Sequence, residues 1–265
     1  MPRQAQPRLW EFDFPTGQIR HGRFSGQIDV GRPELGLHHL RWNASTLPGN
    51  ILGARWSPPD NALSAEAASI GDPAAHVRDA YIRGCDLVAN YQPTSLWPFS
   101  SQVYWRADPL DTPEDILAPL LLMISLQTDL LDTHPEIDVH TQLLAEEVLF
   151  IPLGNPDAVE VLSSSKRPAA SRPTTRSEYG CLLFRLPGGQ LSLVEMAHPS
   201  DFRQFELTRQ AGFNRSNWRL FAHFLEKGVI RRTRMFAACV PRAGDVTSAA
   251  TCFGSFANSP LPLTA

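Results

Sequence analysis

The sequence lacks the short motifs that define the common nucleotide-dependent and metal-dependent enzymes. It contains no GxxxxGK[ST] or GxGxxG loop, no GxSxG nucleophile elbow, no HExxH helix and no EF-hand loop. Its four cysteines are scattered without a CxxC pair, and the adjacent His38 and His39 would point to opposite faces of a strand. We therefore expect no cofactor and no bound metal.

An excess of charge of one sign is lacking too. The chain has 24 basic and 27 acidic residues, a net charge of −3 and a pI near 6.2, so neither nucleic acid nor an anionic membrane is an expected partner. The longest apolar block, Ile116–Leu126, contains Pro119 and is shorter than the ~20 residues of a membrane-spanning helix. The stretch MPRQAQPRLWEFDF carries charges where a secretory signal would be apolar. These features predict a reduced, cytoplasmic protein, and they leave its oligomeric state open.

What the sequence does contain is turns. The 265 residues include 23 prolines and 17 glycines, which separate many short alternating runs such as Leu9–Phe14 and His76–Tyr91. Units of strand, helix and strand in succession are missing, so a parallel nucleotide-binding sheet is disfavoured. We predict an all-β protein, a large antiparallel β-sandwich with few short helices. It should form one domain over residues 1–265, with a flexible internal loop near 162–177 and a surface tail at Thr251–Ala265.

The clearest local structure is the stretch Tyr179–Asp201, YGCLLFRLPGGQLSLVEMAHPSD. Two apolar runs flank Pro187-Gly188-Gly189, and glycine adopts the positive φ of a tight turn without steric cost. The stretch therefore predicts a β-hairpin. Leu182, Phe184 and Leu186 would share one face, with Leu191 and Leu193 opposite them in the core.

His198 and Asp201 follow this hairpin and are the candidate catalytic residues. The Pro199 turn could bring the two side chains together, so that the carboxylate orients an imidazole acting as general acid or base. The alternative is structural, with Asp201 capping the turn and His198 held in a hydrogen bond.

A second candidate set combines aromatic and arginine side chains on alternating positions. Aromatic rings stack on sugars, and arginine forks bind carboxylate or phosphate groups. Core packing and cross-strand ion pairs are the alternative explanation. The candidate substrate-binding residues are Tyr81, Arg83, Tyr104, Arg106, Arg232 and Arg234.

Three segments resemble parts of a known architecture: LEKGVIRRTRMFAACVPR late in the chain, and DAYIRGCDLVANY and QVYWR earlier. With the many antiparallel strands, they resemble the β-supersandwich of the galactose mutarotase-like superfamily. That superfamily includes aldose epimerases, which open and close a hexose ring with a histidine acid and a glutamate base. The resemblance implies that His198 stands for the histidine, but no glutamate follows Glu226.

Two functions follow as expectations. The first is a carbohydrate-related protein that binds or isomerises a sugar, neutral or acidic, in a concave sheet groove. The second is a non-catalytic β-sandwich that serves protein interaction or assembly, with its arginines neutralised by internal ion pairs.

Overall fold

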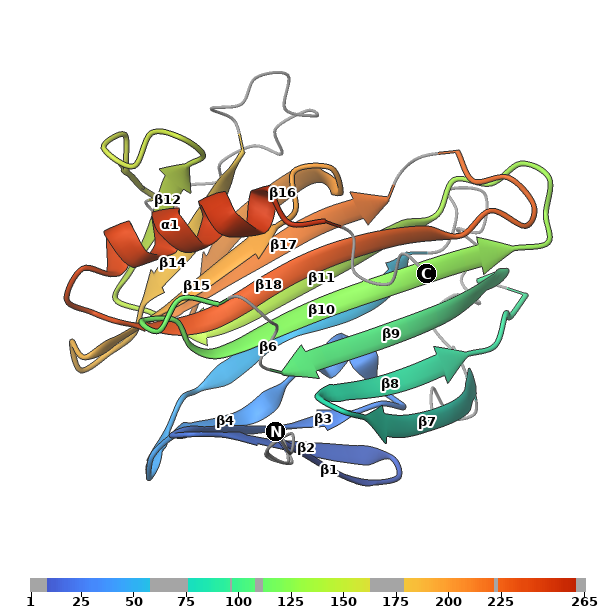
Figure 1. Cartoon of the computed structure of the whole chain (residues 1–265), viewed down its shortest axis with the longest axis horizontal. Helices are drawn as coiled ribbons and strands as arrows, with labels where there is room; N and C mark the ends of the chain where they lie inside the picture. Colours follow the sequence, from blue (N-terminus) through green and yellow to red (C-terminus); the bar gives the residue numbers. More distant parts are fainter. Residues whose placement is uncertain are drawn as a thin grey trace, which may run out of the picture.

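Three antiparallel sheets make up nearly all of the protein in the computed structural model, which describes residues 9–57, 76–95, 97–107, 112–162, 179–221 and 224–260 (Figure 1). Within these ranges every pair of hydrogen-bonded strands is antiparallel, from the first hairpin to the last. The predicted all-β sandwich is therefore confirmed. The loop predicted near 162–177 lies, beyond Leu162, outside the described residues.

The largest sheet has nine strands in the order β13-β12-β14-β15-β18-β10-β9-β8-β7. Its strands come from both halves of the chain, and the late strand β18 lies between β15 and β10. The bounds are β7 (Val77–Arg83), β8 (Asp86–Tyr91), β9 (Phe99–Ala107), β10 (Leu117–Thr128), β12 (Glu147–Pro152), β13 (Glu160–Val161), β14 (Gly180–Arg185), β15 (Leu191–Ala197) and β18 (Arg231–Pro241).

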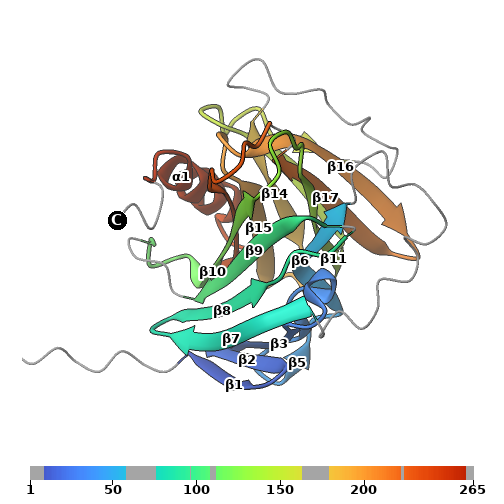
Figure 2. The same ribbon diagram turned by 90° about the vertical axis from the view of Figure 1, so that its right-hand side faces the viewer.

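The four-stranded sheet lies behind the large one, and the five-stranded sheet lies below its β7–β8 edge (Figure 2). The four-stranded sheet has the order β16-β17-β11-β6, with β6 (Gly49–Ser57), β11 (Glu136–Leu144), β16 (Phe202–Gln210) and β17 (Phe213–Phe221). The five-stranded sheet is a meander of β1 (Trp10–Asp13), β2 (Thr16–His21), β3 (Phe24–Asp29), β4 (His38–Trp42) and β5 (Ser45–Thr46). A short 3-10 helix, η1 (Pro33–Leu35), contacts β6.

One continuous core fills the space between the sheets. Alternate residues of the strands enter this core, because successive side chains of a strand point to opposite faces of the sheet. Trp105, Leu122 and Phe184 come from the large sheet, and Val139 and Trp218 come from the four-stranded sheet. The hairpin prediction is confirmed: Leu182, Phe184, Leu186, Leu191 and Leu193 all lie in this core.

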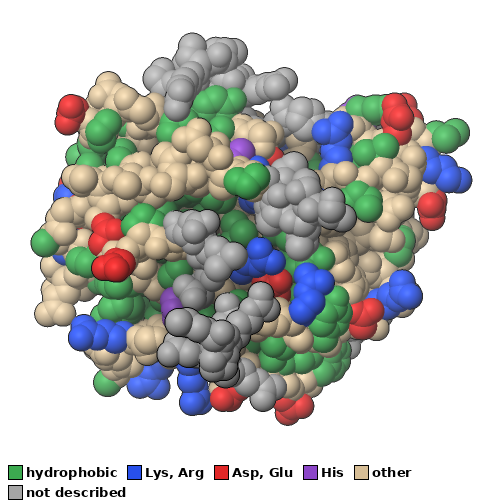
Figure 3. Space-filling view, in the orientation of Figure 1, with side chains coloured by type: hydrophobic (Ala, Val, Ile, Leu, Met, Phe, Trp, Pro, Cys, Tyr) green, Lys and Arg blue, Asp and Glu red, His purple; other side chains and the backbone are tan. Residues whose placement is uncertain are grey.

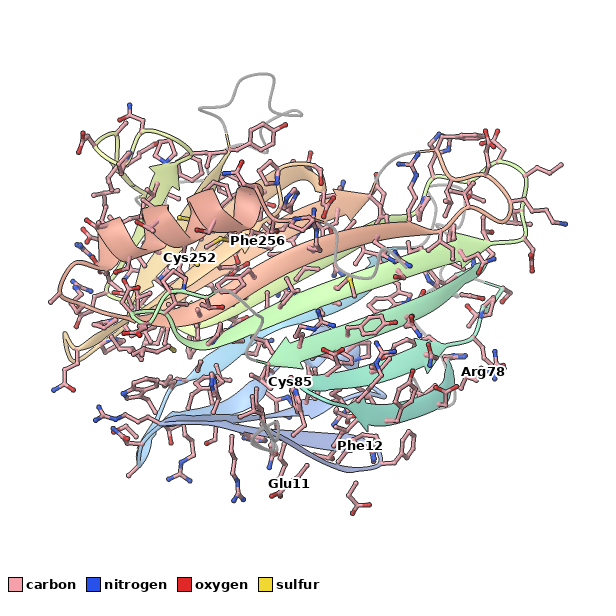
Figure 4. All side chains as sticks on the ribbon, in the orientation of Figure 1. Glu11, Phe12, Arg78, Cys85, Cys252 and Phe256 are labelled. Atoms are coloured by element: carbon pink, nitrogen blue, oxygen red, sulfur yellow. The ribbon has the colours of Figure 1, made fainter. Side chains whose placement is uncertain are left out.

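The surface tail predicted at Thr251–Ala265 is wrong for its first half. A helix, α1 (Asp245–Ala257), lies across β14, β15 and β18 on the outer face of the large sheet (Figures 1 and 4). Ala249, Cys252, Phe253 and Phe256 recur at helical spacing and are buried against that sheet. No described helix has the length and hydropathy to cross a membrane.

Candidate functional site

The six predicted substrate-binding residues lie on one face of one sheet. Residues directly opposite each other in an antiparallel pair point to the same side. The register places Tyr81 opposite Val88, Val88 opposite Tyr104, Tyr104 opposite Met123, and Met123 opposite Arg234. This central row runs across the outer face of the nine-stranded sheet. The other three candidates fall in the two neighbouring rows, so the structure places all six on this face of the sheet.

The row on one side, Arg83-Asp86-Arg106, neutralises its charges internally. Arg106 donates to both carboxylate oxygens of Asp86, at 2.7 and 2.9 Å. Arg83 lies 3.7 Å from the same carboxylate, and its guanidinium carbon is 5.7 Å from the centre of the Tyr104 ring. Asp86 is 4% exposed, so its carboxylate depends on these arginines for charge compensation. This is the cross-strand pairing expected under the structural alternative.

The Arg106→Lys variant tests how much the two hydrogen bonds from Arg106 to Asp86 contribute to stability. Arg106→Lys should lower the free energy of unfolding by about 1 kcal/mol, because an ammonium cannot match both oxygens at once. Arg83→Lys is the matched control, since Arg83 makes only one long contact with Asp86 and is half exposed. This variant should lower the free energy of unfolding by less than about 0.5 kcal/mol. Urea unfolding at neutral pH measures both, and equal costs would contradict the assignment.

The row on the other side is a polar ladder beside an open hollow. Asp79, Asn90, Gln102, Ser125 and Arg232 lie opposite one another in turn. Asn90 donates to Asp79, Gln102 donates to Asn90 at 2.6 Å, and Arg232 donates to Ser125 at 3.3 Å. The hollow has a volume of about 440 Å³, and its lining includes Arg78, which lies on the edge strand β7 (Figure 4). Charged side chains of both signs and apolar ones lie side by side on this face away from helix α1 (Figure 3).

His198, Asp201 and Arg234 form a buried cluster next to the end of helix α1. Asp201 accepts hydrogen bonds from the backbone N–H of Arg234 at 2.9 Å and from its Nε at 3.4 Å. Ser200 links the predicted pair, since its hydroxyl lies 2.8 Å from His198 Nδ1 and 2.6 Å from Asp201. The predicted proximity of His198 and Asp201 is therefore observed.

This cluster is closed on its outer side by the segment after helix α1. Arg234 is 2% exposed and donates to the carbonyl oxygens of Ser259 and Pro260. The His198 ring contacts Phe256 edge to face, with the ring centres 5.4 Å apart. Burial, and then the charge of Arg234, lower the pKa of His198 to about 4. The imidazole is neutral at physiological pH in a packed environment, and its catalytic role stays a prediction.

A second polar surface, which the sequence reasoning missed, lies on the outer face of the four-stranded sheet. Here Gly53, His140, Asn217 and Glu206 stand opposite one another in turn across β6, β11, β17 and β16. A parallel row holds Arg55, Asp138 and Arg219, in which Asp138 accepts from both arginines at 3.2 Å. We call the first row the His140 row.

Two polar atoms in the His140 row are buried without a hydrogen-bond partner: Nδ1 of His140 and Oδ1 of Asn217. Such atoms are rare, because an unpaired buried polar group costs about 1–3 kcal/mol. His140 is 8% exposed. Gly53 makes room for it, since a methyl group there would come within 2.8 Å of the imidazole and 2.5 Å of the Glu34 carbonyl oxygen. The row therefore holds a ring nitrogen and an amide oxygen whose hydrogen bonds are not made within the described protein.

The charge state of His140 follows from its surroundings. Burial lowers its pKa to about 4, and Arg215 and Arg55 add to this effect, while Asp138 opposes it. The ring is therefore neutral above about pH 5 and can take up a proton. On the exposed side of the same row, Glu206 supplies a carboxylate. Nowhere in the described ranges do three His, Cys, Asp or Glu side chains group as metal ligands would.

The alternation in EIDVHTQLL was the signal that could have revealed this row. Its apolar positions, Ile137 and Val139, are in the core, so Asp138 and His140 must share the outer face. The pairing of β11 with β6 and β17 was not readable locally, because the paired residues are at least 69 positions apart along the chain.

No protein-family model matches the chain, and no curated protein matches it in sequence. Solved structures do match its fold. The GalM/aldose epimerase homologue from C. elegans aligns with a TM-score of 0.55 at 7% identity, over 84% of this chain and 98% of that one. A candidate aldose 1-epimerase from Escherichia coli K12 aligns with a TM-score of 0.54 at 7% identity, over 84% and 97%.

A third structure is the alpha-N-acetylgalactosaminidase from Bifidobacterium bifidum in complex with GalNAc, with a TM-score of 0.52 at 8% identity. The alignment covers 88% of this chain and 36% of the longer chain of that structure. The chain therefore has the galactose mutarotase-like fold shared with aldose 1-epimerases, which confirms the resemblance expected from the sequence. At 7–8% identity the likeness establishes the fold alone.

Proposed function

We propose that this protein binds a sugar on the outer face of the four-stranded sheet and interconverts its anomers there. The observation that carries the proposal is the pair of buried, unpartnered atoms, His140 Nδ1 and Asn217 Oδ1, side by side in one row. Sugar hydroxyls both donate and accept hydrogen bonds and could satisfy the two atoms together. The aldose epimerase fold supports a carbohydrate ligand by analogy.

Anomer exchange needs a base that removes the proton of the anomeric hydroxyl and an acid that protonates the ring oxygen. His140 is neutral at physiological pH and can exchange a proton with one of these oxygens. Glu206 lies two strands away in the same row, and two strand spacings are roughly 10 Å. A pyranose ring fits between them over Asn217, with His140 at one end and the carboxylate at the other.

Polarimetry tests this assignment against the one drawn from the sequence. The optical rotation of freshly dissolved α-D-galactose, α-D-glucose and α-D-galacturonic acid is followed with and without the protein. The acidic sugar is included because Arg55, Arg215 and Arg219 lie on the same face of this sheet. His140→Gln should slow the catalysed exchange about 100-fold, the usual loss of a general acid–base group. The rate of the unaltered protein should be flat above about pH 5 and fall as His140 is protonated near pH 4.

His198→Gln is the matched variant, because His198 is equally buried and has a similarly lowered pKa. It should keep the exchange rate of the unaltered protein once the folded fraction is corrected by circular dichroism. Loss of exchange in His198→Gln alone would transfer the site to the cluster under helix α1. If no sugar of the panel is exchanged or shifts the melting temperature, the non-catalytic alternative is supported instead.

A further inference from the structure

Two loops at one end of the nine-stranded sheet expose a concentration of apolar side chains. One loop follows β10 and the other precedes β18. Of the eight large apolar side chains that are exposed in the described part of the chain, five lie here. They are Leu130 (47% exposed), Leu131 (79%), Phe224 (42%), Val229 (40%) and Ile230 (54%), and we call them the apolar loop patch. Such concentrations mark binding surfaces more often than chance exposure does.

The two loops are bonded to each other. Leu225 N–H donates to the Thr133 carbonyl oxygen, and the Thr133 hydroxyl donates to the Leu225 carbonyl oxygen, both at 2.8 Å. Gly228 N–H donates to the Thr128 carbonyl oxygen at 3.0 Å. The patch is therefore held in one arrangement by backbone hydrogen bonds between the loops.

The patch is continuous with the polar hollow described above. Ile230 belongs to the patch and also lines the hollow, next to Arg232. The remaining lining is mostly polar and includes Asp79, Asn90, Gln92, Gln102 and Ser125. A volume of about 440 Å³ lies within the usual range of small-molecule sites, about 300–1,000 Å³. A compact polar group and an apolar chain would thus meet adjoining surfaces of opposite character.

The charges around the hollow and the loops nearly cancel. Asp129, Asp132 and Glu226 lie within the two loops against Lys227, and Arg78 and Arg232 line the hollow against Asp79. This near balance favours neither an anionic nor a cationic headgroup. The amide and hydroxyl groups of the hollow suit a neutral head that carries several hydroxyls.

We propose that the hollow and the apolar loop patch together bind a non-ionic amphiphile, of the class of long-chain alkyl glycosides. The hydroxyl-bearing head enters the hollow over Asn90 and Gln102, and the hydrocarbon chain lies along Ile230 and Leu131. This site is on the opposite side of the core from the His140 row, so it is independent of the sugar exchange proposed there.

Calorimetry with two ligands tests the proposal on the full chain. Octyl β-D-glucoside, kept below its critical micelle concentration, should bind at least tenfold more tightly than methyl β-D-glucoside. Ile230→Ser and Leu131→Ser should each weaken octyl glucoside about tenfold and leave methyl glucoside unchanged. Val161→Ser is the matched control, because Val161 is 58% exposed on the far edge strand β13 and should have no effect. The same comparison in the His140→Gln background removes any contribution of the His140 row, and the tenfold preference for octyl glucoside should persist there.

Four results would overturn the proposal. One is equal binding of the two glucosides, and another is a loss of octyl glucoside binding in Val161→Ser as large as that in Ile230→Ser. Alternatively, light scattering would show that Leu131→Ser converts a dimer into a monomer without changing octyl glucoside binding, which would assign the patch to self-association. Preference for octyl phosphate over octyl glucoside would likewise refute a non-ionic head.

Discussion

Asp201→Ala should lower the free energy of unfolding by about 3–5 kcal/mol, the usual cost of leaving one member of a buried ion pair alone. Arg234 is 2% exposed, and Asp201 is the only carboxylate in an ion pair with it among the described residues. The guanidinium also donates to the neutral carbonyl oxygens of Ser259 and Pro260. Loss of the carboxylate therefore leaves a positive charge buried beneath the segment that follows helix α1.

A double-mutant cycle with Arg234→Met separates the charge from the packing. The double variant, with Asp201→Ala and Arg234→Met, should lose about 2 kcal/mol less unfolding free energy than the two single variants lose in sum. The reason is that the double variant buries no unpaired charge. Urea unfolding at pH 7 gives all four free energies. Strict additivity, or a loss below about 1 kcal/mol in Asp201→Ala, would show that water or the chain compensates Arg234 without the carboxylate.

The second large effect concerns Glu195, which is fully buried between the two main sheets. Its carboxyl oxygens accept from the Ser216 hydroxyl at 3.1 Å, and burial raises its pKa to about 7. Relative to the ordinary value of 4.5, this corresponds to about 3 kcal/mol. Because the folded state holds the proton more tightly, that stability is present below about pH 4.5 and is lost as the pH rises through 7.

Glu195→Gln should therefore be about 3 kcal/mol more stable than the unaltered protein at pH 8.5 and nearly equal to it at pH 5. Glutamine keeps the acceptor for Ser216 and carries no charge at any pH. Glu11→Gln, at an exposed position of β1, is the control and should leave the pH dependence unchanged. Urea unfolding from pH 5 to 8.5 measures this, and a flat stability of the unaltered protein over that range would contradict the prediction.

His140 and His198 act in the opposite direction at lower pH. Burial lowers both pKa values from 6.5 to about 4, so the unfolded chain takes up protons first, and stability falls as the pH drops from 6.5 to 4. Together with Glu195, these residues place the maximum of stability at mildly acidic pH.

The sequence predicted much of what depends on alternation within one strand. The faces of the hairpin at Tyr179–Asp201 were predicted correctly, and so was the shared face of Arg232 and Arg234. The link between His198 and Asp201 also lies within a single turn. Helix α1 was missed although Ala249, Cys252 and Phe256 recur at helical spacing, because the glycine and small polar residues between them lower its helix propensity.

What this sequence determined by itself is therefore the all-β class, the main hairpin and the side of its two strands that faces the core. These depend on the period of two and on turn chemistry, which act between near neighbours. Only the tertiary structure decided which strands are adjacent, such as β18 beside β10 and β11 between β6 and β17. Pairing over such distances is selected by burial of the whole core, and it alone brought His140 beside Asn217 and placed Arg234 under the chain that follows α1.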